Sequence, residues 1–164
     1  MTGPVRDRDP DGRARNARPR DADGRPLSRD ATGVERVPDK LRLTPAETLA
    51  EAERLLRADL PFAAHEVLES QWKVQRDAES AEARCWQALA QLAVGLTHLQ
   101  RSNVVGATAL LRRAAENLAP FEAAPMHGLP IAALGGWAAT FADAVESAGA
   151  GQAELIAARP PLSA

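Results

Sequence analysis

Two ionisable side chains one helical turn apart raise the question of function. In the stretch PFAAHEVLESQWK (61–73), His65 and Glu69 stand among large apolar residues. Residues three or four apart share a face of a helix, so both would lie on one face with Phe62 and Trp72. A histidine paired to a carboxylate in a dry environment can act as a general base, and both groups can also ligate a metal ion.

A second polar stripe follows on the next predicted helix. Gln87, Gln91 and His98 recur at helical spacing, and no charged residue occurs between Cys85 and Gln100. Such a helix is expected to be central and buried on most sides. Its polar groups then need partners inside the protein, because an unpaired buried polar group costs about 1–3 kcal/mol.

The turn between these two helices, near residue 79, predicts how the stripes meet. Counting outward from this turn, His65 falls level with Gln91, and Glu69 lies slightly closer to the turn. We therefore predict one hydrogen-bonded cluster whose central members are His65, Glu69 and Gln91. Four flanking side chains complete the candidate binding and catalytic set: Glu66, Trp72, Gln87 and His98.

The predicted cluster admits three interpretations. In the favoured one it fixes the helix register of an interaction or structural module. In the second, His65, Glu69 and Glu66 supply acid–base chemistry, for instance in a hydrolase, and the glutamines stabilise an oxyanion. In the third, HEVLE resembles the HExxH zinc helix, and His65, Glu69 and His98 hold a single divalent ion. A nucleotide cofactor is not indicated, because no glycine-rich phosphate loop is present.

Helical periodicity dominates the chain from residue 44 onward, and no strand pattern occurs. The first helix begins with Thr44, Pro45 and Glu47, the residue types of an N-cap, a first-turn proline and a capping box. Five helices are predicted, at about 45–58, 61–76, 81–101, from 103 to 120, and from 131. Short connections make consecutive helices antiparallel neighbours. The fold class is therefore all-α, a compact antiparallel bundle of two helical hairpins and a C-terminal helix.

Composition divides the chain into three parts. Residues 1–40 hold ten basic and eight acidic residues with almost no large apolar ones, which predicts a flexible leader. Residues 41–148 form the helical domain, and residues 149–164 a tail. The net charge of -2 argues against nucleic acid as a partner, and no apolar run is long enough for a membrane span. We expect a soluble cytoplasmic protein whose partner is a protein or a small ligand.

Three linked blocks resemble the small all-helical proteins called domain-of-unknown-function family 309. The blocks are FAAHEVLESQW (62–72), WQALAQLAVGLTHLQRSN (86–103) and the pairs Gly106-Ala107 and Leu110-Leu111. The resemblance runs from Leu60 to Leu118. Ala88 departs from it, because the family often has glycine there. The resemblance implies a compact helical bundle and singles out the same polar residues, but it implies no activity, substrate or cofactor.

Overall fold

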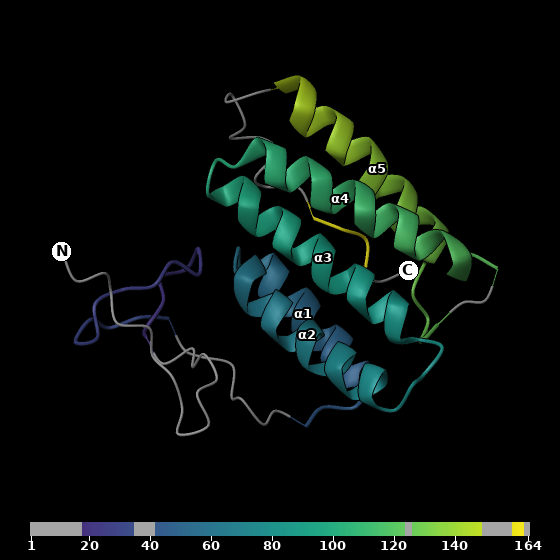
Figure 1. Ribbon diagram of the computed structural model, residues 1–164, viewed down its shortest axis with the longest axis horizontal. Coiled ribbons are helices and arrows are strands. Elements are labelled where there is room, and N and C mark those ends of the chain that lie inside the picture. The colour runs from purple at the N-terminus through teal and green to yellow at the C-terminus, as the bar shows by residue number, and fades with distance from the viewer. Residues whose placement is uncertain (1–17, 35–41, 124–125, 149–158, 163–164) are drawn as a thin grey trace.

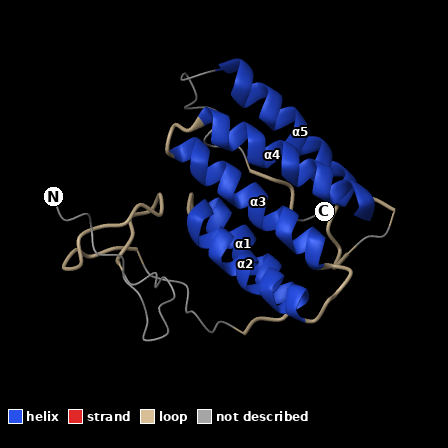
Figure 2. Cartoon of the chain, viewed as in Figure 1, coloured by secondary structure: helices blue, strands red, loops and turns tan. Residues whose placement is uncertain are grey.

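Five α-helices follow one another with short connections, which confirms the all-α prediction. The computed structural model describes residues 18–34, 42–123, 126–148 and 159–162; the rest of the predicted leader and tail lies outside this range. The elements are α1 (Pro45–Arg57), α2 (Pro61–Asp77), α3 (Ala83–Gln100), α4 (Val104–Leu118), the 3₁₀ turn η1 (Ala119–Phe121) and α5 (Ile131–Ala148) (Figure 1). Within the described residues no β-strand occurs, apart from one isolated bridge between Arg20 and Pro26 (Figure 2).

Local signals explain where the helices begin. Thr44 accepts a hydrogen bond from the Glu47 backbone, and the Glu47 carboxylate accepts one from the Thr44 backbone, so the predicted capping box is present. Asn103 caps α4 by accepting a hydrogen bond from the Gly106 N–H at 3.0 Å. Proline occupies the first turn of both α1 and α2, where its missing N–H leaves no intrahelical hydrogen bond unmade.

The turns between the first four helices all use a left-handed residue that is not glycine. Asp59, Glu79 and Ser102 have φ values of 60°, 53° and 58°. This conformation is unfavourable for residues with a Cβ atom. The turns are therefore held by the packing of the helices that they connect rather than by local preference.

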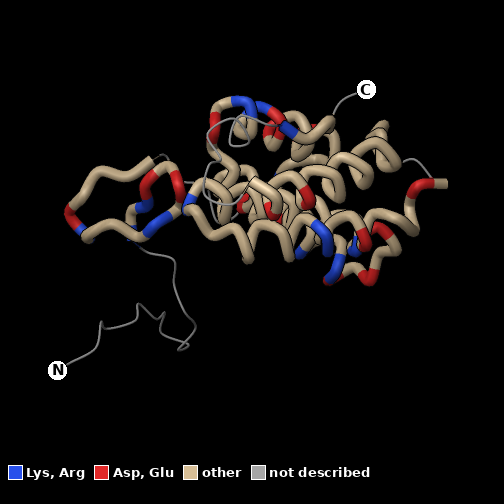
Figure 3. The backbone as a smooth tube through the Cα atoms, turned by 90° about the horizontal axis from the view of Figure 1, so that it is seen from above, with Lys and Arg blue, Asp and Glu red and all other residues tan. Residues whose placement is uncertain are grey.

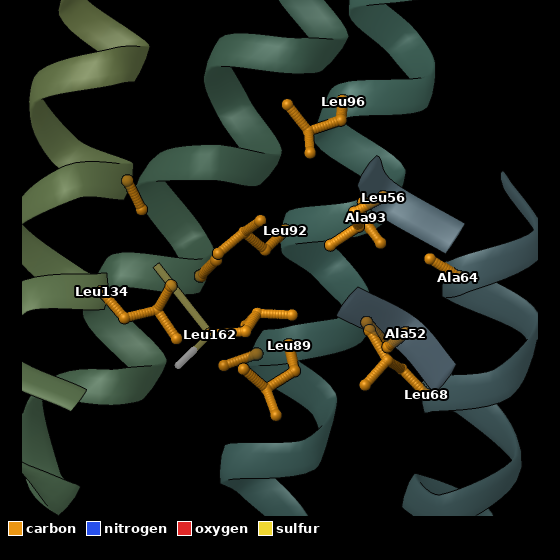
Figure 4. Packing of buried hydrophobic residues seen from close by; sticks show 14 of the residues in the cluster. Ala52, Leu56, Ala64, Leu68, Leu89, Leu92, Ala93, Leu96, Leu134 and Leu162 are labelled. Atoms are coloured by element: carbon orange, nitrogen blue, oxygen red, sulfur yellow. The ribbon is translucent and has the colours of Figure 1, made fainter. Parts of the chain in front are cut away.

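Each helix packs mainly on its neighbours in the sequence, so α3 lies between α2 and α4, and α5 lies on α4. Most of α3 is buried, as its lack of charge predicts. Figure 4 shows Leu56 of α1 beside Ala93 of α3, and Leu162 from the chain's C-terminal segment beside Leu134 of α5. The core thus extends through the whole array of helices. Among the described residues, every helix is too short or too polar to cross a lipid bilayer.

Residues 18–34, which we call the N-terminal strap, contact the helices, whereas composition predicts a flexible leader. Asp21 and Gly24 form a hydrogen-bonded turn, and the Arg101 Nε atom of α3 donates to the Asp23 carbonyl at 2.8 Å. Both acidic and basic residues occur along the strap (Figure 3). Composition alone does not register the aromatic residue Phe62 of α2, against which this part of the predicted leader lies.

Candidate functional site

His65 and Glu69 lie on the same side of α2, as their spacing predicts, but they do not form the expected pair. The buried Nδ1 atom of His65 has no hydrogen-bond partner in the described part of the chain. Its ring instead contacts the Phe62 ring, with centroids 5.8 Å apart. Glu69 forms an ion pair with Lys73, with an oxygen–nitrogen distance of 3.2 Å. The structure therefore does not show the hydrogen-bonded arrangement that a base held by a carboxylate needs.

Both candidate histidines favour the neutral state. Burial lowers the pKa of His65, the nearby Glu69 charge raises it, and Lys73 lowers it further. Burial also lowers the pKa of His98, with a smaller contribution from Arg101. The Nδ1 atom of His98 lies 2.7 Å from the Asn103 side-chain nitrogen, which donates to a neutral imidazole. His98 thus belongs to the α3–α4 turn rather than to a cluster with His65.

Gln91 turns toward α4, so the predicted cluster of His65, Glu69 and Gln91 is wrong. The Asn117 side-chain nitrogen donates to the Gln91 Oε1 atom at 2.9 Å. The Arg84 Nε atom donates to the Asn117 Oδ1 atom, also at 2.9 Å. Helical spacing identified the polar stripe of α3 correctly, but it does not say which of two flanking helices a given side chain faces.

The metal interpretation fails on the placement of its three candidate ligands. In the described ranges, no group of three or more His, Cys, Asp or Glu side chains is arranged to hold a metal ion. Since His98 is engaged at the start of α4 and Glu69 pairs with Lys73, these two and His65 do not converge.

The remaining predicted residues have separate surroundings. The half-buried Trp72 packs against the core, and the Arg76 guanidinium lies 5.3 Å from its ring centroid. Gln87 is half-buried on α3. Glu66 lines a small pocket beneath the strap together with Arg20 and Phe62. These positions do not make a single site with His65.

A groove between α1 and α2 was missed by the sequence prediction. Its volume is about 630 Å³, and its lining includes Leu43 and Pro45 near the start of α1 and Val67, Gln71 and Val74 on α2. Val67, Gln71 and Val74 follow at helical spacing and form a second line along α2. Their spacing was the available signal, since a glutamine on an apolar line is unusual.

Gln71 is the distinctive residue of this groove. It is only 6% exposed and its side chain makes no hydrogen bond with another described residue, but its amide atoms are not fully enclosed and can be reached from the groove. Val74 beside it is 58% exposed, so the groove also offers apolar surface. The groove therefore combines an amide that has no partner among the described residues with an exposed apolar side chain, and both can bind a ligand.

Comparisons with known proteins give one family. Residues 49–110 match the family model described as Domain of unknown function (DUF309). Neither the curated proteins nor the solved structures gave a significant match. The matched segment runs from α1 through α2 and α3 into α4, and it contains most of the motif residues that suggested the resemblance. The helical segment 49–110 is thus similar to this family of unknown function.

Proposed function

We propose that the protein is a helical interaction module that binds a partner polypeptide in the groove between α1 and α2. The observation that carries this proposal is Gln71, a buried amide in the groove without a hydrogen-bond partner among the described residues. Its amide atoms are not fully enclosed, so they are available to a ligand in the groove. A bound backbone would supply hydrogen-bond partners, because an amide side chain can donate to a carbonyl and accept from an N–H.

The shape of the groove favours an extended peptide. Its lining follows α2 from Val67 to Asp77, which at 1.5 Å per residue corresponds to roughly 15 Å. An extended chain rises about 3.3 Å per residue, so four or five residues would span this length. Leu43, Val67 and Val74 provide the apolar surface that aliphatic side chains of such a peptide would cover.

The charges of the groove favour an acidic residue in that peptide. Lys73 already pairs with Glu69, and Asp77 pairs with Arg76. Arg42, at the end next to α1, makes no ion pair with any described residue. A guanidinium binds a carboxylate through two parallel hydrogen bonds. The proposed ligand class is therefore an extended segment with aliphatic side chains and one acidic residue.

The polar stripes identified from the sequence then serve the fold. Gln91 and Asn117 join α3 to α4, and His98 joins the end of α3 to the turn before α4. His65 and Glu69, the candidate acid–base residues, do not line the groove. These observations support a module that binds rather than one that catalyses a reaction.

Selection from a phage-displayed random peptide library tests the proposal. We expect the selected peptides to contain aliphatic residues next to an acidic one. Val74→Asp should weaken binding of a labelled selected peptide at least tenfold, because it places a like charge in the apolar part of the groove. Val105→Asp is the matched control, since Val105 is 82% exposed at the start of α4, outside the groove.

Two results would contradict the proposal. One is a set of selected peptides that bind wild type and Val74→Asp equally well. The other is a consensus rich in basic residues, which the unpaired Arg42 would repel.

A further inference from the structure

The N-terminal strap is seated on an aromatic ring by its one buried glycine. Gly24 has φ +72°, and a Cβ atom at this position would lie 2.2 Å from the Phe62 Cγ atom. No side chain fits there, so the Phe62 ring packs directly against the strap backbone. Glycine is favoured here for two reasons: the backbone is left-handed, and there is no space for a Cβ atom.

Two arginines flank the same ring. The Arg20 guanidinium of the strap lies 5.0 Å from the Phe62 ring centroid, and the Arg101 guanidinium of α3 lies 5.8 Å from it. Both distances are within the range of cation–π attraction. Arg20 also donates to the Gly24 carbonyl, which closes the turn, and Arg101 donates to the Asp23 carbonyl. Phe62 thus contacts a side chain and the backbone of the turn, and Arg101 binds the backbone of the turn.

The strap adds nothing to the hydrophobic core. None of its described residues belongs to the buried apolar cluster, which is built from the helices, the loop before α5 and Leu162. Phe62 and Arg101 lie within the segment that matches the family model, whereas the strap lies outside it. The surface that receives the strap is therefore part of the folded domain, and the strap is a separate piece that rests on it.

We propose that Phe62 and Arg101 form a docking site for a turn of the pattern Arg-x-x-x-Gly. The strap occupies this site within its own chain, and another polypeptide with such a turn binds there by displacing the strap. The arginine of such a turn stacks on the Phe62 ring, as Arg20 does, and glycine is required where the ring meets the backbone. The Arg101 side chain fixes the register by binding the carbonyl that precedes the glycine. The site lies at the start of α2 and is distinct from the α1–α2 groove, so it does not depend on the proposed function.

Tethering explains how a small contact holds the strap in place. A segment attached by a short linker has an effective concentration on the order of 1 mM. If the free turn bound with a dissociation constant of about 0.1 mM, the ratio of strap-occupied to empty sites would be about ten. A competing polypeptide must displace the strap, so the competing polypeptide should bind more tightly when the strap has been released.

A peptide of residues 18–34 carrying a fluorescent label provides the probe, with binding to the full chain measured by fluorescence polarisation. Gly24→Ala in the protein should expel its own strap, because the added Cβ would collide with Phe62. We expect this variant to bind the wild-type peptide at least tenfold more tightly than the wild-type protein does. A peptide carrying Gly24→Ala should bind neither protein.

Second substitutions in the Gly24→Ala protein identify the site. Adding Phe62→Ala or Arg101→Gln should weaken peptide binding at least fivefold, whereas Val74→Asp in the distant groove should leave it unchanged. Arg101→Gln keeps the aromatic ring and guards against a folding defect in Phe62→Ala. The proposal is overturned if Gly24→Ala binds the peptide no better than wild type, or if neither Phe62→Ala nor Arg101→Gln weakens binding.

Discussion

Two buried amide side chains in this protein have opposite surroundings. Asn117 on α4 is 8% exposed, and both ends of its amide are paired, with Gln91 and with Arg84. Gln71 on α2 is 6% exposed and lines the groove without a partner in the described part of the chain. Burial alone therefore does not reveal the role of a polar residue. The satisfied amide fixes the position of two helices, and the unsatisfied one is available to a ligand.

The largest effect on stability is expected from Asn117→Leu. The substitution keeps a similar volume but removes two hydrogen bonds between α3 and α4. At about 1 kcal/mol for each bond, the free energy of unfolding should fall by about 2 kcal/mol. Urea unfolding measures this change. An unchanged midpoint would show that the Gln91–Asn117 contact does not hold the helices together, and the contrast with Gln71 would disappear.

Gln71→Leu should have a smaller effect on stability. Leucine removes an amide that bonds no described residue, so no hydrogen bond within the described structure is lost and the free energy of unfolding should change by less than about 1 kcal/mol. Binding of a groove-selected peptide should weaken in the same variant. If Gln71→Leu instead destabilises the protein as much as Asn117→Leu, Gln71 has a structural partner and the groove loses its main support.

His65 is a third buried polar side chain that can be compared with Asn117 and Gln71. The pH dependence of stability tests its surroundings. Burial depresses its pKa below the ordinary value of 6.5 in the folded protein. The unfolded chain then binds a proton more readily, so stability is present above pH 6.5 and falls as the pH drops toward the folded pKa. His65→Leu should reduce this loss, and NMR titration of the His65 ring should give a midpoint below 6.5.

His98 contributes in the same direction, because its pKa is also lowered. His98→Gln is therefore the control that separates the two contributions. A His65 midpoint at or above 6.5 would mean that its ring has found an acceptor or reaches solvent, which would place it with Asn117 rather than with Gln71.

The smallest effect on stability is expected from Glu69→Gln. Among the described residues Glu69 pairs only with Lys73, four residues later, and such partly exposed helical pairs contribute about 0.3–0.5 kcal/mol. The loss should not exceed this amount. Removing the negative charge should also lower the pKa of His65 further, which the same NMR titration would detect. A loss of 2 kcal/mol or more would restore the buried His65–Glu69 pair that the sequence suggested.

The sequence predicted the helices well because their end signals are local. The predicted helices at 45–58 and 61–76 correspond to Pro45–Arg57 and Pro61–Asp77, and the capping box at Thr44 is present. Proline, capping residues and polar connections act within one turn of the chain, so a single sequence reveals them.

The candidate site was predicted less well because it depends on how neighbouring helices are rotated. The shared face of His65 and Glu69 follows from spacing, but the choice of Asn117 over His65 as partner of Gln91 depends on the packing of α3 against α4. Asn117 itself stands between Ala114 and Leu118 on the apolar face of α4, and this position could have marked it as a buried partner. No residue in the strap, or next to it in the sequence, predicts that the strap packs on Phe62.

The order of the helices in space has a consequence for how the chain folds. Because each helix packs chiefly on the one made just before it, most native contacts join residues that are close in the sequence. Chains dominated by such local contacts fold fast, since few long loops must close first. Each helix can therefore settle on its predecessor while the protein is still being synthesised. The ion pair between Arg159 and Asp59 joins residues that are a hundred positions apart, so it can form only after residue 159 has left the ribosome.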